Sequence, residues 1–213
     1  MPLSSVLGAS TLIKPGVVTS STRPAVPYEG QLIYETDTDR IAAYSGSAWV
    51  TQNGLQLIKA QAVGSGVSSV TVTGAFNSTY DSYDIIWTGG VASGSSNGRL
   101  TLGSVATGYY AGWLDINYVS GATVALTDNN QAYWSFGSVG QTGIIQMKVH
   151  LDGPNLAKIT TAIFTNPNPT AGGGSLYGSG YNTSTLQHTD FTLTAASGTW
   201  TGGTIRVYGY ANN

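Results

Sequence analysis

Cysteine is absent from this chain of 213 residues, and charged side chains are scarce. Without cysteine the fold has neither a disulfide nor a thiolate metal site. Asp, Glu, Lys and Arg make up only 8% of the residues, against roughly 25% in ordinary soluble domains. The eight Lys and Arg residues are scattered, whereas nucleic-acid binding needs clustered cations to replace phosphate counterions. We therefore expect no nucleic-acid partner.

Long apolar runs and helical patterns are missing as well. No stretch approaches the ~18 consecutive apolar residues of a membrane span. The first residues lack the basic start and the apolar segment of a signal peptide. No heptads and no long stripe with a 3.6-residue period are present, which argues against a coiled-coil stalk. We expect no membrane insertion and few helices.

The residues that are abundant favour β-structure. The chain has 29 Gly, 13 Tyr and 5 Trp, a composition that suits short strands separated by tight turns. Residues 144–152 alternate strictly between apolar and polar side chains, which predicts a half-buried strand. Shorter alternating segments recur through residues 55–213, with Gly, Asn and Ser between them. We predict an all-β fold whose main domain, residues 55–213, is a jelly-roll-like antiparallel sandwich of eight to ten strands.

Two smaller parts precede the predicted sandwich. Residues 1–27 contain four prolines and few apolar residues, which predicts an irregular, extended arm. Residues 28–54 predict a β-meander of three short strands with turns at residues 37–39 and 45–47. A meander of this size has no second layer of its own to cover it.

Apolar residues fall on both faces of the predicted meander, which indicates that neighbouring copies cover it. An obligate oligomer hides such a surface, and symmetry lets one sequence cover itself. We predict a homotrimer with these interface residues: Leu32, Ile33, Tyr34, Ile41, Tyr44 and Trp49.

Residues 21–50 have the most specific resemblance in the chain. They read STRPAVPYEGQLIYETDTDRIAAYSGSAWV. This motif resembles a module common in bacteriophage tail-fibre and virion structural proteins, where it usually lies near the start of a chain. Residues 203–210, GTIRVYGY, resemble the closing strand of phage fibre tip domains.

The resemblance implies a virion protein that is assembled in the host cytoplasm and exposed on the particle surface. It implies a short trimeric tail fibre, or receptor-binding fibre, that contacts a host surface polysaccharide. Residues 1–27 would then attach the chain to other virion proteins. An alternative is a capsid decoration (cement) protein or head fibre that stabilises the particle, because both roles use an arm, a trimer and an outer domain.

Residues that carry enzyme chemistry are few. The two histidines, His150 and His188, are expected at the solvated surface. The acidic turn around Asp37 and Asp39 is more typical of turn capping than of a calcium site. No nucleophile elbow is followed by a helix. We predict no catalytic residues, no metal and no cofactor, and hence no enzyme.

Residues 166–182 form the segment best suited to binding. The segment is rich in Gly, Asn, Ser and Tyr and has the composition of adaptable recognition loops. We predict a long loop in which Tyr177, Tyr181 and Asn182 bind glycans; a solvent loop or a subunit contact is the alternative. Tyr109-Tyr110 with Trp113 is a second candidate, which we expect to pack in a sheet or between subunits.

Overall fold

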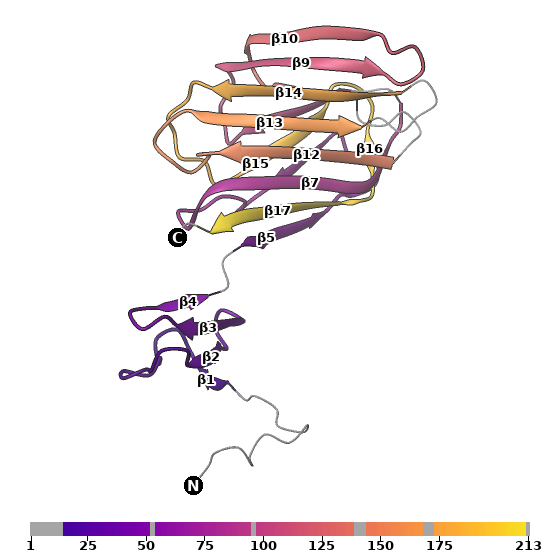
Figure 1. Cartoon of the computed structure of the whole chain (residues 1–213). Coiled ribbons are helices and arrows are strands. Elements are labelled where there is room, and N and C mark those ends of the chain that lie inside the picture. Colours follow the sequence, from indigo (N-terminus) through magenta and orange to yellow (C-terminus); the bar gives the residue numbers. More distant parts are fainter. Residues whose placement is uncertain (1–14, 52–53, 95–96, 139–143, 168–172, 212–213) are drawn as a thin grey trace. The chain divides into compact units, whose positions relative to one another are not determined.

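The computed structural model describes residues 15–51, 54–94, 97–138, 144–167 and 173–211 (Figure 1). Strands dominate these residues and helices are absent from them, so the described part of the chain has no helix that could cross a membrane. The predicted all-β fold is confirmed. The chain divides into two compact units, residues 1–54 and 55–213. We call them the small unit and the sandwich unit.

The small unit contains a four-stranded sheet in the order β1-β2-β3-β4. Its strands are β1 (Gly16–Val18), β2 (Leu32–Glu35), β3 (Arg40–Tyr44) and β4 (Trp49–Thr51). Strands β2, β3 and β4 form the predicted antiparallel meander. The β2–β3 turn needs a left-handed residue, which Asp39 supplies with a φ of 52°.

The prediction of an irregular arm over residues 1–27 is wrong for residues 16–18, which form strand β1. Strand β1 pairs in parallel with β2, so the arm and the meander share one sheet. The Arg23 guanidinium donates to the buried Glu35 carboxylate at 2.5 Å and holds the pKa of that carboxyl below its usual range. The backbone N–H of Ser20 donates to Asp37 at 2.8 Å. Residues 1–14 lie outside the described residues.

The sandwich unit is built on a nine-stranded sheet in the order β10-β9-β14-β13-β12-β7-β17-β5, with β16 beside β7. Figure 1 shows its face. The strands are β5 (Leu55–Ala62), β7 (Tyr80–Ala92), β9 (Tyr109–Asn117), β10 (Thr123–Gln131), β12 (Ile144–Asp152), β13 (Thr160–Pro167), β14 (Gly174–Asn182), β16 (Trp200–Thr201) and β17 (Thr204–Ala211). Every pair in this sheet is antiparallel.

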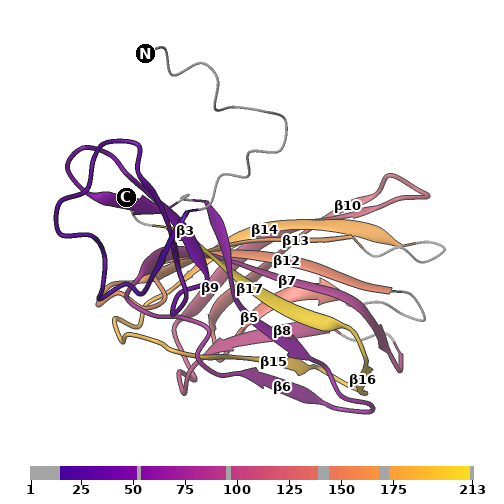
Figure 2. The ribbon, with the colours of Figure 1, turned by 90° about the horizontal axis from the view of Figure 1, so that it is seen from below.

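A four-stranded sheet forms the second layer, in the order β11-β8-β15-β6 (Figure 2). Its strands are β6 (Ser69–Val72), β8 (Asn97–Leu102), β11 (Trp134–Ser138) and β15 (Phe191–Ala195). The two sheets together exceed the eight to ten strands predicted for this domain. The reason is that several strands, β14 among them, have compositions that resemble loops.

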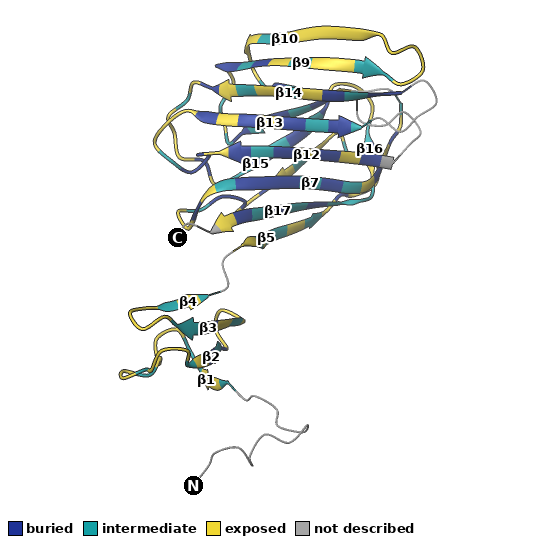
Figure 3. Cartoon of the chain, in the orientation of Figure 1, coloured by how far each residue is buried: buried dark blue, intermediate teal, exposed yellow. Residues whose placement is uncertain are grey.

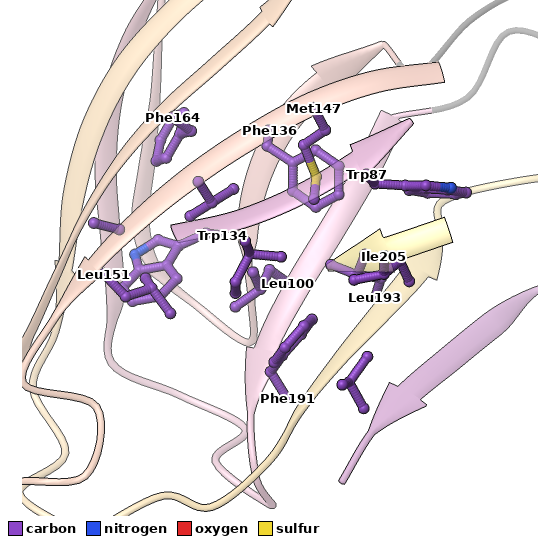
Figure 4. Close-up of a cluster of buried hydrophobic side chains, with 14 of the residues drawn as sticks. Trp87, Leu100, Trp134, Phe136, Met147, Leu151, Phe164, Phe191, Leu193 and Ile205 are labelled. Atoms are coloured by element: carbon purple, nitrogen blue, oxygen red, sulfur yellow. The ribbon is translucent and has the colours of Figure 1, made fainter. Parts of the chain in front are cut away.

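The core lies between the two sheets (Figure 4). The alternation in residues 144–152 is confirmed, because in β12 Met147 and Val149 are buried while Lys148 faces outward. The rings of Trp87 and Trp200 meet edge to face with centroids 4.8 Å apart. Each large apolar side chain buried in this way stabilises the fold by about 1.5–3 kcal/mol. Because this packing buries one face of the large sheet, the alternate side chains of the same strands lie on its other, outward face.

Candidate functional site

The segment predicted as a glycan-binding loop is mostly strand. Strand β13 ends at Pro167 and β14 begins at Gly174, and the two pair along the full length of β13. The segment between them, residues 168–172, lies outside the described residues. The prediction of a long loop is therefore wrong for residues 174–182.

Glycine in β14 serves close packing rather than turn formation. A Cβ atom on Gly178 would lie 2.4 Å from the Phe164 ring and 2.5 Å from the Trp113 Cβ. A Cβ atom on Gly180 would lie 2.3 Å from the Tyr110 carbonyl oxygen. Both glycines face the sandwich interior, where neighbouring groups leave no room for a side chain. The composition of β14 resembles that of a loop, but its glycines are there because the sheet is crowded at these positions.

Alternation along β14 places Tyr177 and Tyr181 on the outward face of the large sheet. Both rings are substantially exposed, at 53% and 42%. The register pairs Tyr181 with Tyr110 of β9, and their rings stack with centroids 5.0 Å apart and an interplanar angle of 11°. Tyr110 belongs to the second binding candidate in the sequence, which we expected to pack in a sheet or between subunits. Its neighbour Tyr109 is buried, as alternation requires.

A cavity of about 620 Å³ lies beside the stacked tyrosine pair. We call it the tyrosine cleft. Gly112 and Ser179 pair directly across β9 and β14. Gly112 has no side chain and that of Ser179 is small, so the cleft stays open between them. Hydroxyl and amide side chains complete the lining: Thr127, Asn129 and Thr161. Apolar rings beside hydroxyls and amides suit a ligand with both C–H faces and hydroxyl groups.

Charge at the tyrosine cleft is confined, among its described lining residues, to Asp128. Its carboxylate accepts a hydrogen bond from the Ser135 backbone N–H at 2.8 Å, so one of its oxygens is already bonded within the protein. Burial raises the pKa of this carboxyl and outweighs the hydrogen bonds from Ser135, which favour the charged form. The cleft therefore suits an uncharged ligand.

A second cavity of about 420 Å³ lies on the same face beside Tyr177. Its outward lining residues include Gln146 and Lys148 of β12 and Thr165 of β13. Tyr177 and Tyr181 are four residues apart in β14, so about 13 Å separates them along the strand. A ligand that touches both tyrosines must therefore be an extended chain rather than a single small molecule.

Asn182, the third predicted glycan-binding residue, is fully buried and has a structural role. Its side-chain N–H donates to the Thr107 carbonyl at 3.1 Å, and its side-chain oxygen accepts from the Ser184 N–H at 2.8 Å. Both bonds tie the end of β14 to neighbouring loops. Its assignment as a glycan-binding residue is corrected, because no polar atom of the side chain is left to face a ligand.

Replacing Asn182 by alanine should lower the free energy of unfolding by about 1–3 kcal/mol, because two partly buried hydrogen bonds to the backbone are lost. The outward face of β14 should stay unchanged in the folded variant, so a ligand of that face should bind as it does to the wild type. Chemical denaturation measures the first effect, and Thr185→Ala, an exposed neighbour, is the control. If Asn182→Ala kept the wild-type stability but lost ligand binding, Asn182 would be a binding residue after all.

A charged cluster occupies the middle of the same sheet face. The buried Asp84 carboxylate of β7 lies 2.8 Å from Lys148 Nζ, 2.8 Å from His150 Nδ1 and 2.9 Å from the Tyr210 hydroxyl. Burial acts to raise the pKa of Asp84, but the hydrogen bonds from these three side chains outweigh it and the pKa is lowered. We expected His150 to be a solvated surface residue. It is partly exposed, but its ring also contacts the Asp84 carboxylate.

The Asp84 cluster should make stability depend on pH. Because the folded-state pKa lies below the ordinary value of 3.8, its stabilisation is present above about pH 4 and is lost as the pH falls through the folded-state pKa. Asp84→Asn should therefore destabilise the protein by about 1–3 kcal/mol at pH 6 and by less at pH 3. Urea unfolding at both values measures this. An equal loss at both would show that the carboxylate charge contributes nothing.

His188 is also buried, not solvated as expected, and its Nε2 has no hydrogen-bond partner. Burial lowers its pKa, so it is held in the neutral form. It lines a cavity of about 480 Å³ with Ser104 and Asp190. Within the described ranges, no group of three or more His, Asp or Glu side chains is placed to hold a metal ion.

The sheet of the small unit exposes one apolar face. The register places Val17 beside Tyr34 and Tyr34 beside Ile41, while Leu32 and Val50 both flank Ala43. Val17 and Ile41 are 68% and 57% exposed. We call this the small-sheet face, and its residues are Val17, Leu32, Tyr34, Ile41 and Val50.

The predicted trimer-interface residues divide between the two faces of this sheet. Leu32, Tyr34 and Ile41 lie on the small-sheet face. Ile33, Tyr44 and Trp49 lie on the opposite face, where Ile33 is fully buried within the chain. The rings of Tyr44 and Trp49 contact each other there, with centroids 5.4 Å apart. Sequence reasoning missed Val17, because its partner strand lies well beyond it in the chain.

Two surfaces are therefore available for contacts outside the chain. The small-sheet face is flat and apolar, which suits another protein surface. The tyrosine cleft combines aromatic rings with uncharged hydrogen-bonding groups, which suits a carbohydrate. Comparisons of the chain with protein-family models, with curated proteins and with solved structures found no match.

Proposed function

We propose that this chain is a structural protein of a bacteriophage particle, a short trimeric fibre that binds neutral glycans of the host surface. The observation that carries the proposal is the stacked Tyr110–Tyr181 pair beside a cavity lined by hydroxyl and amide groups. Sugar rings present apolar faces that stack on aromatic rings, and their hydroxyls bond to Thr, Ser and Asn side chains.

Assembly is the second part of the proposal. The small-sheet face would be covered by other copies of the chain, because a thin sheet with one open apolar face lacks a second layer. Support also comes from the resemblance of residues 21–50 to virion structural proteins. In this proposal residues 1–14 attach the fibre to other virion proteins, since residues 16–18 already belong to the sheet.

Repetition of the glycan site would compensate for weak binding. A shallow cleft buries little ligand surface, so a single site should bind with a dissociation constant of about 1 mM. Three copies in one fibre raise the effective affinity when their spacing fits the polymer. Since the cleft carries little charge, binding should depend only slightly on salt concentration.

Two measurements test the proposal. An array of neutral and charged polysaccharides probed with the full-length protein should retain it on neutral chains at both 50 mM and 500 mM NaCl. Labelling of intact particles should then place the subunit on the tail. Labelling over the capsid, with no retention on the array, would reject the fibre and favour a capsid decoration protein or head fibre.

A further inference from the structure

The hairpin of β9 and β10 exposes apolar side chains on both of its faces. Leu126 pairs with Trp113 on the face that continues the core side of the sheet. Ala125 pairs with Leu114 on the opposite face. Leu126, Val124 and Leu114 are 42%, 53% and 47% exposed, and Figure 3 shows β10 exposed along almost its whole length. In an antiparallel sheet of a globular domain, one face is usually apolar and packs on the core, while the other is polar and faces water.

The free edge of this hairpin is unprotected over residues 123–127, while Asp128 and a register shift between Asp128 and Gln131 interrupt the rest of β10. Strand β10 ends the nine-stranded sheet, and residues 123–127 contain neither a charge nor a proline. The other edge strand, β5, carries Lys59, and its ladder with β17 is interrupted by a register shift. Charges and bulges are what keep sheet edges from pairing with other chains, and residues 123–127 have neither.

The small-sheet face is too small to hold an assembly alone. A stable interface involves roughly 20–30 residues from each partner, whereas the small-sheet face consists of five. Self-association of this chain, which is part of the proposed function, therefore needs further contact area from the same chain. The β9–β10 hairpin offers it, because five exposed large apolar side chains gather there: Leu114, Tyr118, Val119, Val124 and Leu126.

We infer that the β9–β10 hairpin is a second self-association surface, which packs against the sandwich units of other copies of this chain. Each subunit of a cyclic trimer has two neighbours, and a hairpin that exposes apolar side chains on both faces can contact both. Within residues 109–131 the charged side chains are Asp115 and Asp128, so a contact made by the hairpin would rest mainly on apolar and uncharged polar side chains.

The double variant Val124→Glu with Leu126→Glu, made in the full-length chain, tests this surface. Sedimentation equilibrium should show self-association weakened at least tenfold, while the far-ultraviolet circular dichroism spectrum stays that of the wild type and shows that the variant is folded. The matched control is Ile159→Glu with Leu186→Glu, two side chains of similar exposure outside the strands, and it should assemble normally. Unchanged assembly of the hairpin variant would overturn the inference.

Hydrogen exchange of the wild-type chain gives a second measurement that needs no variant. Amides of β10 should exchange more slowly at concentrations where the chain is assembled than where it is monomeric. Equal exchange would overturn the hairpin contact while leaving the glycan site and the small-sheet face untouched. If the double variant assembles normally but is no longer incorporated into particles, the hairpin contacts another virion protein. That result would likewise overturn the inference. A chain that is monomeric at every concentration would overturn both self-association surfaces.

Discussion

Replacing Ile41 by glutamate is expected to dissociate the assembled protein. Ile41 lies beside Tyr34 on the small-sheet face and is 57% exposed in the single chain, so the folded monomer tolerates a charge there. In the assembly the same carboxylate would be buried among apolar side chains without a partner. Such burial costs several kcal/mol per copy, and each 1.4 kcal/mol weakens association about tenfold.

Light scattering over a range of concentrations measures this effect. The wild-type chain should have three times the monomer mass of 22.0 kDa, and Ile41→Glu should approach the monomer mass at micromolar concentration. The control is Val26→Glu, because Val26 is 92% exposed and lies outside the four strands of the small sheet. A variant that keeps the wild-type mass and association constant would show that this face is not an interface.

Loss of adsorption to host cells is the expected result of replacing Tyr110 and Tyr181 together by alanine. Removing both rings takes away the aromatic surface on which a ligand would stack in the tyrosine cleft. The binding free energy of each copy should become less favourable by about 1.5–3 kcal/mol. Binding at one site should weaken about 10- to 100-fold. Because three sites act together, adsorption of particles should fall further than binding at a single site.

Two further variants locate the effect. Tyr177→Ala should reduce adsorption less, since Tyr177 lies about 13 Å along the strand from Tyr181 and contacts only a long ligand. Tyr28→Ala removes an exposed tyrosine of the small unit and should change nothing. Incorporation into particles should be normal for all variants, since each ring is at least partly exposed. Wild-type adsorption of the Tyr110/Tyr181 double variant would exclude the cleft as a receptor site.

Local patterns of the sequence determined the fold class and several strands. Low charge, abundant glycine and the absence of helical periodicity pointed to an all-β protein, and strict alternation located β12 between Ile144 and Asp152. The turns of the meander were also recognisable, because Asp and Gly supply the backbone geometry that tight turns need. These signals are local: neighbouring residues of one strand report which of its faces is buried.

Only the tertiary structure decided which strands lie side by side. Strand β1 was read as part of an irregular arm, because a three-residue strand has no signature apart from its partner β2. Strand β14 was read as a loop, because Gly178 and Gly180 are there to admit Trp113 and the Tyr110 carbonyl. The stacking of Tyr110 on Tyr181 depends on the register between β9 and β14, and register is set by core packing across the whole sheet rather than by either segment alone.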